Sequence, residues 1–161
     1  MLKNLAFVVI AAAIHAGSAA ELPPSGVVHA TPVQQDDAQV IAAKIARQYE
    51  AANARDFDGY MAAFWHSPLL VYVVDGTVWT GWAEVRGHIE RDYPSLEQTP
   101  RGVLERLETR FVDAQTAITV EYWTAYFPRS RIHGMSVGNW RKLAEGWYMV
   151  QASTSSTDGG S

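Results

Sequence analysis

The sequence contains no cysteine in its 161 residues. This absence excludes disulfide bonds, thiol nucleophiles, cysteine zinc sites, iron–sulfur clusters and a lipid-modified N-terminal cysteine. A chain without disulfides must take its stability from its hydrophobic core alone. Hydrophobic residues make up 48% of the chain and charged residues 19%, which is typical of a single globular domain of this length.

The sequence is also poor in positive charge. Lys and Arg total 13 against 17 Asp and Glu, which gives a formal net charge of -4 at neutral pH. Binding to a nucleic acid backbone requires a basic face, so this balance argues against nucleic acid as a partner. The chain contains no internal repeat.

No apolar run is long enough for a membrane-spanning helix. The run Leu5–Ile14 has about half of the roughly 20 residues that such a helix needs. It follows Lys3 and precedes the small residues 16–20, an order that is typical of a secretory signal peptide. We therefore expect residues 1–20 to be a signal peptide cut before Glu21, and the mature chain to be periplasmic or secreted with no membrane partner.

Helix-breaking and polar residues flank the expected folded unit. Pro23, Pro24 and Pro32 interrupt residues 21–35, which we expect to form a flexible tether. The stretch 153–161 contains only Ser, Thr, Asp and Gly, and such residues cannot bury a core beyond the first positions. The domain is therefore predicted to span residues 36–154, followed by a disordered tail at 155–161.

The first half of the unit is predicted to contain three helices, because apolar residues recur in it at helical spacing. Between the second and third helices, Asp75-Gly76 is a strong signal for a β-hairpin. The second half alternates as four strands. The expected helices cover about 36–55, 56–67 and 81–93, and the later strands about 103–112, 117–127, 135–143 and 147–152. Helices first and an antiparallel meander last predict an α+β fold.

The expected strand at 117–127 is largely apolar on both faces. Ile118, Val120 and Tyr122 share one face, whereas Trp123 lies on the other. Helices of the same chain can cover only one face of the sheet, so we expect a second copy of the chain to cover the other. The sequence therefore predicts a homodimer through the outer face of the sheet.

Three stretches of the sequence carry a resemblance to a known family. They are YEAANARDF at 49–57, VVDGTVWTGWAEVR at 73–86 and WRKLAEGWYMV at 140–150, of which the last is the most specific. With the expected order of elements, the chain resembles the SnoaL-like branch of the nuclear-transport-factor-2-like superfamily over about 36–154. The resemblance implies a cone-like fold in which three N-terminal helices pack in the concave face of a curved antiparallel sheet, with a pocket at the open end.

The resemblance leaves the chemistry open. Members often carry histidines just after the closing Gly-Trp-x-x-Val run, where this chain has Gln151, Ala152 and Ser153. The superfamily includes isomerases, cyclases, dehydratases, dioxygenase subunits and non-catalytic binding or assembly domains. Membership of such a superfamily therefore does not fix the function of this chain.

One short motif is the pattern of a serine nucleophile elbow, G-x-S-x-G, at residues 134–138. That motif requires a strand–turn–helix setting, followed in the sequence by an acid and a histidine. Here the segment is predicted to be a strand, and no histidine follows His133. We therefore do not expect a serine hydrolase.

The histidines have no metal-ligand spacing, and we expect neither a metal nor a cofactor. His66 lies at the end of the predicted second helix, where it either lies near the pocket and moves protons or stabilises the helix end as a cation. His88 has charged neighbours on the third helix and is expected to be solvated.

Glu121 is the leading candidate for acid–base chemistry. It lies in the middle of the strand at 117–127, between Thr119 and Trp123 on one face. If that face lines the pocket, burial makes Glu121 a candidate general base. If that face is the outer one, Glu121 is a surface or dimer-contact residue.

Six tryptophans and seven tyrosines are many for this length. An aromatic pocket with a few polar groups is the usual make-up of a small-molecule site, although cores are built from the same residues. The candidates for lining it are Tyr49, Trp65, Tyr72, Trp123 and Trp140. The sequence thus predicts a domain that binds a small apolar or aromatic molecule. The alternatives are a cofactor-independent isomerase, cyclase or dehydratase that uses Glu121 or His66, and a non-catalytic dimerisation module.

Overall fold

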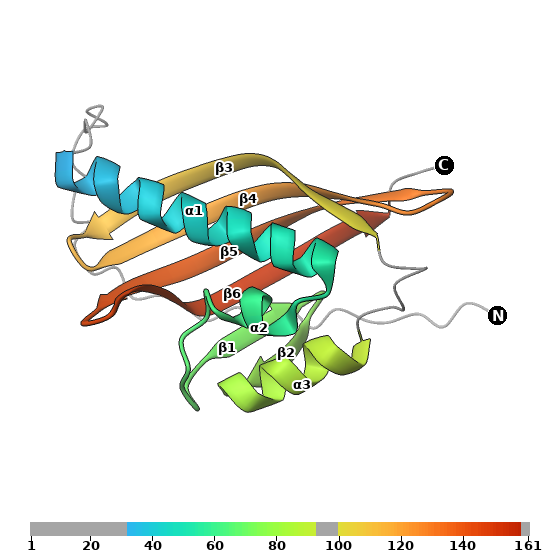
Figure 1. Cartoon of the computed structure of the whole chain (residues 1–161), viewed down its shortest axis with the longest axis horizontal. Helices are drawn as coiled ribbons and strands as arrows, with labels where there is room; N and C mark the ends of the chain where they lie inside the picture. Colours follow the sequence, from blue (N-terminus) through green and yellow to red (C-terminus); the bar gives the residue numbers. More distant parts are fainter. Residues whose placement is uncertain (1–31, 93–99, 159–161) are drawn as a thin grey trace, which may run out of the picture.

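The computed structural model describes residues 32–92 and 100–158, which form three helices and one six-stranded sheet (Figure 1). The predicted signal peptide and most of the predicted tether lie outside the described residues. The helices are α1 (Pro32–Ala54), α2 (Phe57–Met61) and α3 (Trp82–Asp92). The strands are β1 (Val71–Val74), β2 (Thr77–Thr80), β3 (Arg101–Asp113), β4 (Thr116–Tyr126), β5 (Arg131–Leu143) and β6 (Gly146–Asp158).

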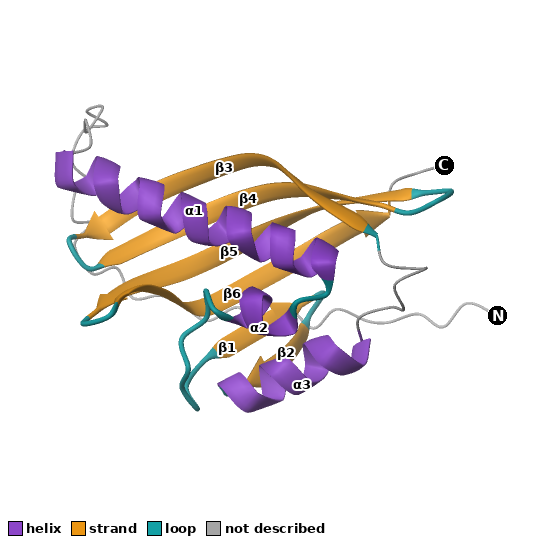
Figure 2. Cartoon of the chain, in the orientation of Figure 1, coloured by secondary structure: helices purple, strands orange, loops and turns teal. Residues whose placement is uncertain are grey.

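The sheet has the order β2-β1-β6-β5-β4-β3. All neighbours are antiparallel except β1 and β6, which pair in parallel. The long helix α1 crosses one face of the curved sheet, and α2 and α3 lie on the same side near β1 and β2 (Figure 2). This arrangement confirms the predicted α+β class and the packing of three helices on one face of a curved sheet.

Helix α1 begins at Pro32, earlier than the predicted start at Asp36. Proline is tolerated in the first turn of a helix, where its missing N–H would have no partner in any case. The prediction of a tether through residue 35 is therefore wrong from Pro32 onward. The side of α1 that faces the sheet carries residues spaced three and four apart; those that are buried include Ile41, Ile45, Gln48 and Ala51.

Helix α2 is much shorter than the predicted helix at 56–67. Asp56 caps it by accepting a hydrogen bond from the Gly59 N–H at 2.9 Å. After the helix, the backbone turns to pair with β6: the Trp65 N–H donates to the Met149 carbonyl, and the Met149 N–H donates to the Ala63 carbonyl, both at 2.9 Å. These backbone bonds to a strand replace the helical bonds that the apolar spacing predicts.

Strand β6 continues to Asp158, beyond the predicted domain end at Thr154. It does so because β5 offers backbone partners as far as the pair Ile132–Asp158. The hairpin residue Asp75 also holds the strand, since its carboxylate accepts the Ser156 N–H and Ser156 Oγ–H, each at 2.8 Å. The prediction of a disordered tail from residue 155 is therefore wrong through Asp158.

The core lies between the three helices and the sheet. Its fully buried side chains include Ile41, Ile45, Leu70, Val85, Trp140 and Trp147. At the start of α1, the Lys142 ammonium donates to both carboxylate oxygens of Asp37, at 2.8 and 2.9 Å. Burial raises the pKa of Asp37, but the hydrogen bonds from Lys142 and Trp147 and the positive charge of Lys142 together outweigh it, and the pKa is lowered overall. This ion pair ties α1 to β5.

The opposite face of the sheet carries no helix in the described part of the chain (Figure 2). Ile118, Val120 and Tyr122 of β4 point to this outer face and are half-buried. The Arg106 guanidinium lies over the Tyr122 ring, 3.8 Å from its centre. Among the described helices, none is both long and apolar enough to cross a membrane.

Candidate functional site

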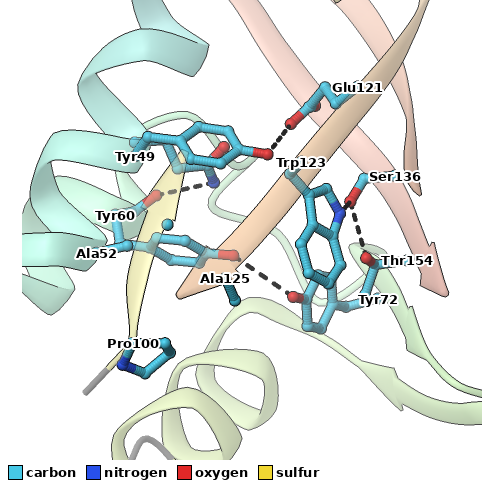
Figure 3. Close-up of a pocket in the computed structure, with 12 residues that line it drawn as sticks. Tyr49, Ala52, Tyr60, Tyr72, Pro100, Glu121, Trp123, Ala125, Ser136 and Thr154 are labelled. Carbon is cyan, nitrogen blue, oxygen red and sulfur yellow. Dashed lines mark hydrogen bonds between the residues drawn. The ribbon is translucent and has the colours of Figure 1, made fainter. Parts of the chain in front are cut away.

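A cavity of about 280 Å³ lies between the second half of α1 and the sheet (Figure 3). Four aromatic side chains line it: Tyr49 of α1, Tyr60 of α2, Tyr72 of β1 and Trp123 of β4. The remaining lining residues are small or polar: Gln48, Ala52, Pro100, Gly102, Glu121, Ala125, Ser136 and Thr154. Every layer of the domain thus contributes to the wall.

A second, smaller chamber of about 40 Å³ lies at the inner end of this cavity. It is bounded on one side by the apolar residues Phe64, Met149 and Ala152. The residues shared by both chambers carry nearly all the polar groups of the site: Gln48, Tyr60, Tyr72, Glu121, Ser136 and Thr154. The polar groups therefore gather where the large chamber meets the small one, and the rest of the large chamber is apolar.

Among the described residues that line the two chambers, Glu121 is the one carboxyl group. Its side chain points to the helix-covered face of β4, and the residue is only 5% exposed. The Tyr49 hydroxyl donates a hydrogen bond to Oε2 at 3.2 Å. Burial raises the pKa of Glu121 to about 7, although the hydrogen bond from Tyr49 acts in the lowering direction. The carboxyl can therefore gain or lose a proton near neutral pH.

Tyr49 is affected by the same surroundings. Its burial raises the pKa of the phenol above its usual value, and the nearby Glu121 carboxylate raises it further. Tyr49 thus stays protonated and acts as a hydrogen-bond donor to Glu121. Lysine, arginine and histidine are absent from the described residues that line the two chambers, so no side-chain cation balances the carboxylate there.

A chain of hydrogen bonds fixes Trp123 as one wall of the cavity (Figure 3). Its indole N–H donates to Ser136 Oγ at 3.0 Å, and Ser136 Oγ–H donates to Thr154 Oγ1 at 2.8 Å. The Thr154 hydroxyl in turn donates to the Met135 carbonyl at 3.4 Å. Three neighbouring strands therefore hold the indole ring in one orientation.

The G-x-S-x-G pattern at 134–138 has a structural explanation on β5. Gly134 lies directly beneath the Trp123 ring, where an added Cβ would be 2.0 Å from Cζ2. Gly138 leaves room for a second indole, because an added Cβ would be 2.9 Å from Nε1 of Trp140. Ser136 lies between them on the same face of the strand. The segment is a regular strand, so the serine is a cavity hydrogen-bonding group and no nucleophile elbow is formed.

The structure brings together four of the residues singled out by the sequence: Tyr49, Tyr72, Glu121 and Trp123 all line the cavity. It does not bring Trp140 or Trp65 there. Trp140 is fully buried in the core, and its indole N–H donates to Thr119 Oγ1 at 3.0 Å. Trp65 lies on the segment that pairs with β6 and is absent from the cavity wall. For these two tryptophans, the prediction of a pocket position is wrong.

The two histidines of interest also lie away from the cavity wall. His66 is exposed and stacks on Trp82 with the ring centres 4.2 Å apart. His88 is half-buried, and it stacks on Trp79 at 3.6 Å. The expectation that His88 is solvated is therefore wrong, because β2 places an aromatic ring against it. In the described residues, no three side chains of His, Cys, Asp or Glu gather as a metal site.

Sequence reasoning missed Gln48, Tyr60, Ser136 and Thr154. Gln48 is 5% exposed, and its amide donates to the Tyr60 carbonyl at 3.2 Å. The Tyr60 and Tyr72 hydroxyls are 3.4 Å apart. A signal for Gln48 was present, since it follows Ile41 and Ile45 at helical spacing and is polar on an otherwise apolar face. Ser136 and Thr154 gave no such signal, because polar residues are common on strands.

Comparison with known proteins agrees with this architecture. A family model described as SnoaL-like domain matches residues 41–159. Among solved structures, an NTF-2 like protein of unknown function from Shewanella oneidensis has 23% identity and a TM-score of 0.67, with 75% of this chain and 98% of that chain covered. A cystatin-like fold protein from Burkholderia xenovorans has 24% identity and a TM-score of 0.66, over 79% of this chain and 96% of its own.

A more distant likeness is to a putative calcium/calmodulin-dependent protein kinase type II association domain from Thiobacillus denitrificans. It has 20% identity and a TM-score of 0.57, with 73% of this chain and 94% of that chain covered. The comparison with curated proteins found no match. Likeness at these identities supports the fold alone, whereas the family model covers most of the chain. The chain belongs to the SnoaL-like domain family, and its fold is NTF2-like.

Proposed function

We propose that this SnoaL-like domain binds a small molecule with an apolar or aromatic body in the cavity beside Glu121. One observation carries the proposal: a cavity of about 280 Å³ with four aromatic walls and its polar groups gathered at one end. An apolar cavity of about 150 Å³ holds one benzene ring, so this one has room for a body of about two fused rings. Such a combination is the usual make-up of a small-molecule site.

The rigidity of the wall supports the same proposal. Trp123 is held by Ser136 and Thr154, and Tyr49 is held by Glu121. At the mouth, the Asn53 side chain ties α1 to β3: it accepts the Gly102 N–H at 2.7 Å and donates to the Gly102 carbonyl at 3.0 Å. A cavity whose walls are already fixed loses little conformational entropy when a ligand enters.

Filling the cavity from α1 is expected to abolish binding. Indole-3-ethanol has a bicyclic body and a neutral polar end, and at about a hundred times its Kd it would add about 2.7 kcal/mol of stability to the wild type. For a domain of this size, that raises the Tm by roughly 5–10 °C. Ala52→Leu places a larger side chain in the cavity and should remove this rise.

The matched control is Ala46→Leu, the same substitution at an exposed position of the same helix. It should leave the ligand-induced rise in Tm unchanged. Equal rises in Ala52→Leu and the wild type would mean that the ligand binds elsewhere, and no rise in the wild type with any bicyclic probe would contradict the proposal.

A second candidate function is cofactor-independent proton transfer, as in an isomerase, cyclase or dehydratase. The observation that favours it is a buried carboxyl with a pKa of about 7, bonded to a tyrosine and facing an apolar cavity. Glu121 would remove a proton from a carbon next to a ketone and return it. His66 is not at the cavity and has no part in this candidate.

Hydrogen exchange into a bicyclic ketone tests this candidate. In D₂O, the wild type should speed the appearance of deuterium next to the carbonyl of 2-tetralone, followed by NMR, and Glu121→Gln should abolish the acceleration. Exchange at the uncatalysed rate in both proteins would contradict proton transfer by Glu121, and the proposal of a binding domain would stand without it.

We also propose that the chain forms a homodimer through the outer face of the sheet. Half-buried apolar residues of β4 (Ile118, Val120 and Tyr122) lie on that face, and β3 carries Arg106, Glu108 and Arg110 beside them. Alternating charges at the rim suit pairing with a second copy about a twofold axis. A light-scattering mass of twice the chain mass is expected, and Val120→Asp should give the monomer mass. A dimer whose cavity binds no ligand would instead support the remaining alternative, a non-catalytic dimerisation module.

Export is proposed from the N-terminal sequence. The order of charge, apolar run and small residues suits cleavage before Glu21. Mass spectrometry of the chain recovered from the periplasm or medium should find Glu21 at the N-terminus, and an intact Met1 on cell-associated protein would contradict this proposal.

A further inference from the structure

Most of the hydrogen-bond donors around the cavity are already used within the protein. The Tyr49 hydroxyl donates to Glu121, and the Trp123 indole donates to Ser136. The Ser136 hydroxyl donates to Thr154, whose own hydroxyl donates to the Met135 carbonyl. These four donors therefore already have acceptors within the protein. A ligand could accept a hydrogen bond from one of them only if the existing bond broke.

Acceptors remain available at the same place. Within the described part of the chain, Glu121 accepts one hydrogen bond, at Oε2, and Oε1 accepts none. The amide of Gln48 donates through Nε2, whereas its Oε1 accepts no hydrogen bond from the described residues. Both side chains line the small inner chamber. The inner end of the cavity thus has acceptor atoms that are available to a ligand and few available donors. This favours a ligand group that donates more hydrogen bonds than it accepts.

The charge of the site points the same way. Its one carboxyl group has no side-chain cation among the lining residues of the described chain. The rings of Tyr49, Tyr60, Tyr72 and Trp123 line the same space, and the π-system of an aromatic ring attracts positive charge. A cationic group is therefore favoured in this cavity by the carboxylate and by the rings (Figure 3).

We propose that the ligand is an aryl-alkyl primary amine, bound as its ammonium ion with the charged nitrogen beside Glu121 and Gln48. An ammonium group has three donors and no acceptor, which matches the free lone pairs. The inner chamber of about 40 Å³ is close to the volume of one water molecule, about 30 Å³, and an ammonium group is of similar size. The aromatic body then occupies the larger chamber, so the inference rests on the proposed function.

Three probes with the same indole body test the nature of the polar end. They are tryptamine, indole-3-ethanol and indole-3-acetate, which are cationic, neutral and anionic at pH 8. Isothermal titration at this pH should find tryptamine bound about tenfold or more tighter than the alcohol, and the acetate weakest. The pH is chosen because Glu121, with a pKa of about 7, is then mostly ionised, whereas an alkyl amine is still protonated.

Glu121→Gln removes the charge and keeps the shape of the side chain. It should abolish the preference for tryptamine over indole-3-ethanol and change the affinity for the alcohol by less than about threefold. Glu50→Gln is the matched control. Glu50 directly follows Tyr49 in α1, is exposed and does not line the cavity. This substitution removes the same charge from the chain and should leave the preference intact.

The pH dependence provides a second readout. The titratable groups that face Glu121 are Tyr49 from α1, Tyr60 from α2 and Tyr72 from β1, while β3 and β5 place Leu107 and Ser136 opposite it. Tyrosines do not ionise below pH 8. Tryptamine affinity should therefore fall as the pH drops below 7 and Glu121 becomes protonated, until it reaches the affinity found with Glu121→Gln, and the affinity for the alcohol should change little.

The outcomes separate this inference from the function on which it rests. If tryptamine and indole-3-ethanol bind equally well to the wild type, the amine inference is wrong and the apolar cavity remains a binding site. If tryptamine binds Glu121→Gln as tightly as the wild type, the amine does not sit beside Glu121 and the inference is again wrong. If none of the three probes binds the wild type, the proposed function fails together with the inference.

Discussion

Replacing Glu121 with glutamine is expected to raise the free energy of unfolding by about 3 kcal/mol at pH 8 and to leave it nearly unchanged at pH 4. The pKa of this carboxyl is about 7 in the folded protein and has an ordinary value of 4.5. The folded state therefore holds its proton more tightly than the unfolded state does. Stability is lost as pH rises from 4.5 to 7, at about 1.4 kcal/mol for each pH unit. Glutamine does not ionise and avoids this loss.

Chemical unfolding of the wild type and Glu121→Gln across pH 4 to 8 measures the difference. Glu50→Gln, at an exposed position, should follow the wild type at every pH. The other buried carboxylate, Asp37, has a lowered pKa, so its contribution is lost only below about pH 3.8 and falls outside this range. Parallel curves for Glu121→Gln and the wild type over pH 4 to 8 would mean that Glu121 is solvated in the folded protein.

Adding one methyl group at Gly134 is expected to destabilise the domain by about 1–3 kcal/mol and to abolish ligand binding. The new Cβ would lie 2.0 Å from Cζ2 of Trp123. The indole ring can move away only at the cost of the hydrogen bond that its N–H donates to Ser136. Relief of the overlap therefore drives the ring into the cavity that it lines. Denaturant unfolding and titration with indole-3-ethanol measure the two effects of Gly134→Ala.

Two further variants isolate the cause. Gly87→Ala adds the same methyl group in helix α3, where it would meet no atom within 4 Å, and should stabilise the protein by about 0.5–1 kcal/mol through helix propensity. In a Trp123→Leu background, Gly134→Ala should cost much less than in the wild type, because the ring that it overlaps is gone. A cost that stays the same in both backgrounds would contradict the account of the Gly134–Trp123 contact.

The sequence predicted the order and type of the helices and strands, but it predicted only some of the residues that line the cavity. Alternation on β4 told which residues share a face with Glu121, but both faces are apolar, so the pattern alone could not tell which one the helices cover. The position of α1 decides this, and no local pattern encodes it. The face that carries Glu121 is the covered one, which made its candidacy as a cavity residue correct.

Trp123 and Trp140 illustrate a second limit. Both point to the covered face of the sheet, yet one lines the cavity and the other is in the core. The register of β4 and β5 separates them, since Trp123 lies opposite Gly134 and Trp140 lies opposite Ala117, at the other end of the pair. Trp140 packs in the cluster with Ile41 and Ile45 of α1, whereas the next turns of that helix leave the cavity open. Residue type cannot distinguish these two places.

Errors at the ends of elements also have a physical cause. Residues 155–158 look disordered because they are small and polar, but β5 supplies backbone partners for them and Asp75 holds Ser156. The second predicted helix was too long because the segment after Met61 pairs with β6. In both places, backbone hydrogen bonds to a strand distant in the sequence outweighed the conformation that the local residues favour.

The measurement that tests the central claim most directly is an NMR titration of the Glu121 carboxyl carbon, assigned by its loss in Glu121→Gln, with and without tryptamine. The claim is that Glu121 is a buried carboxyl whose free oxygen faces a ligand cavity. It predicts a midpoint near pH 7 in the free protein, moved to lower pH when tryptamine is bound, because a cation favours the ionised carboxyl. A midpoint near the ordinary value of 4.5, unmoved by tryptamine, would contradict it.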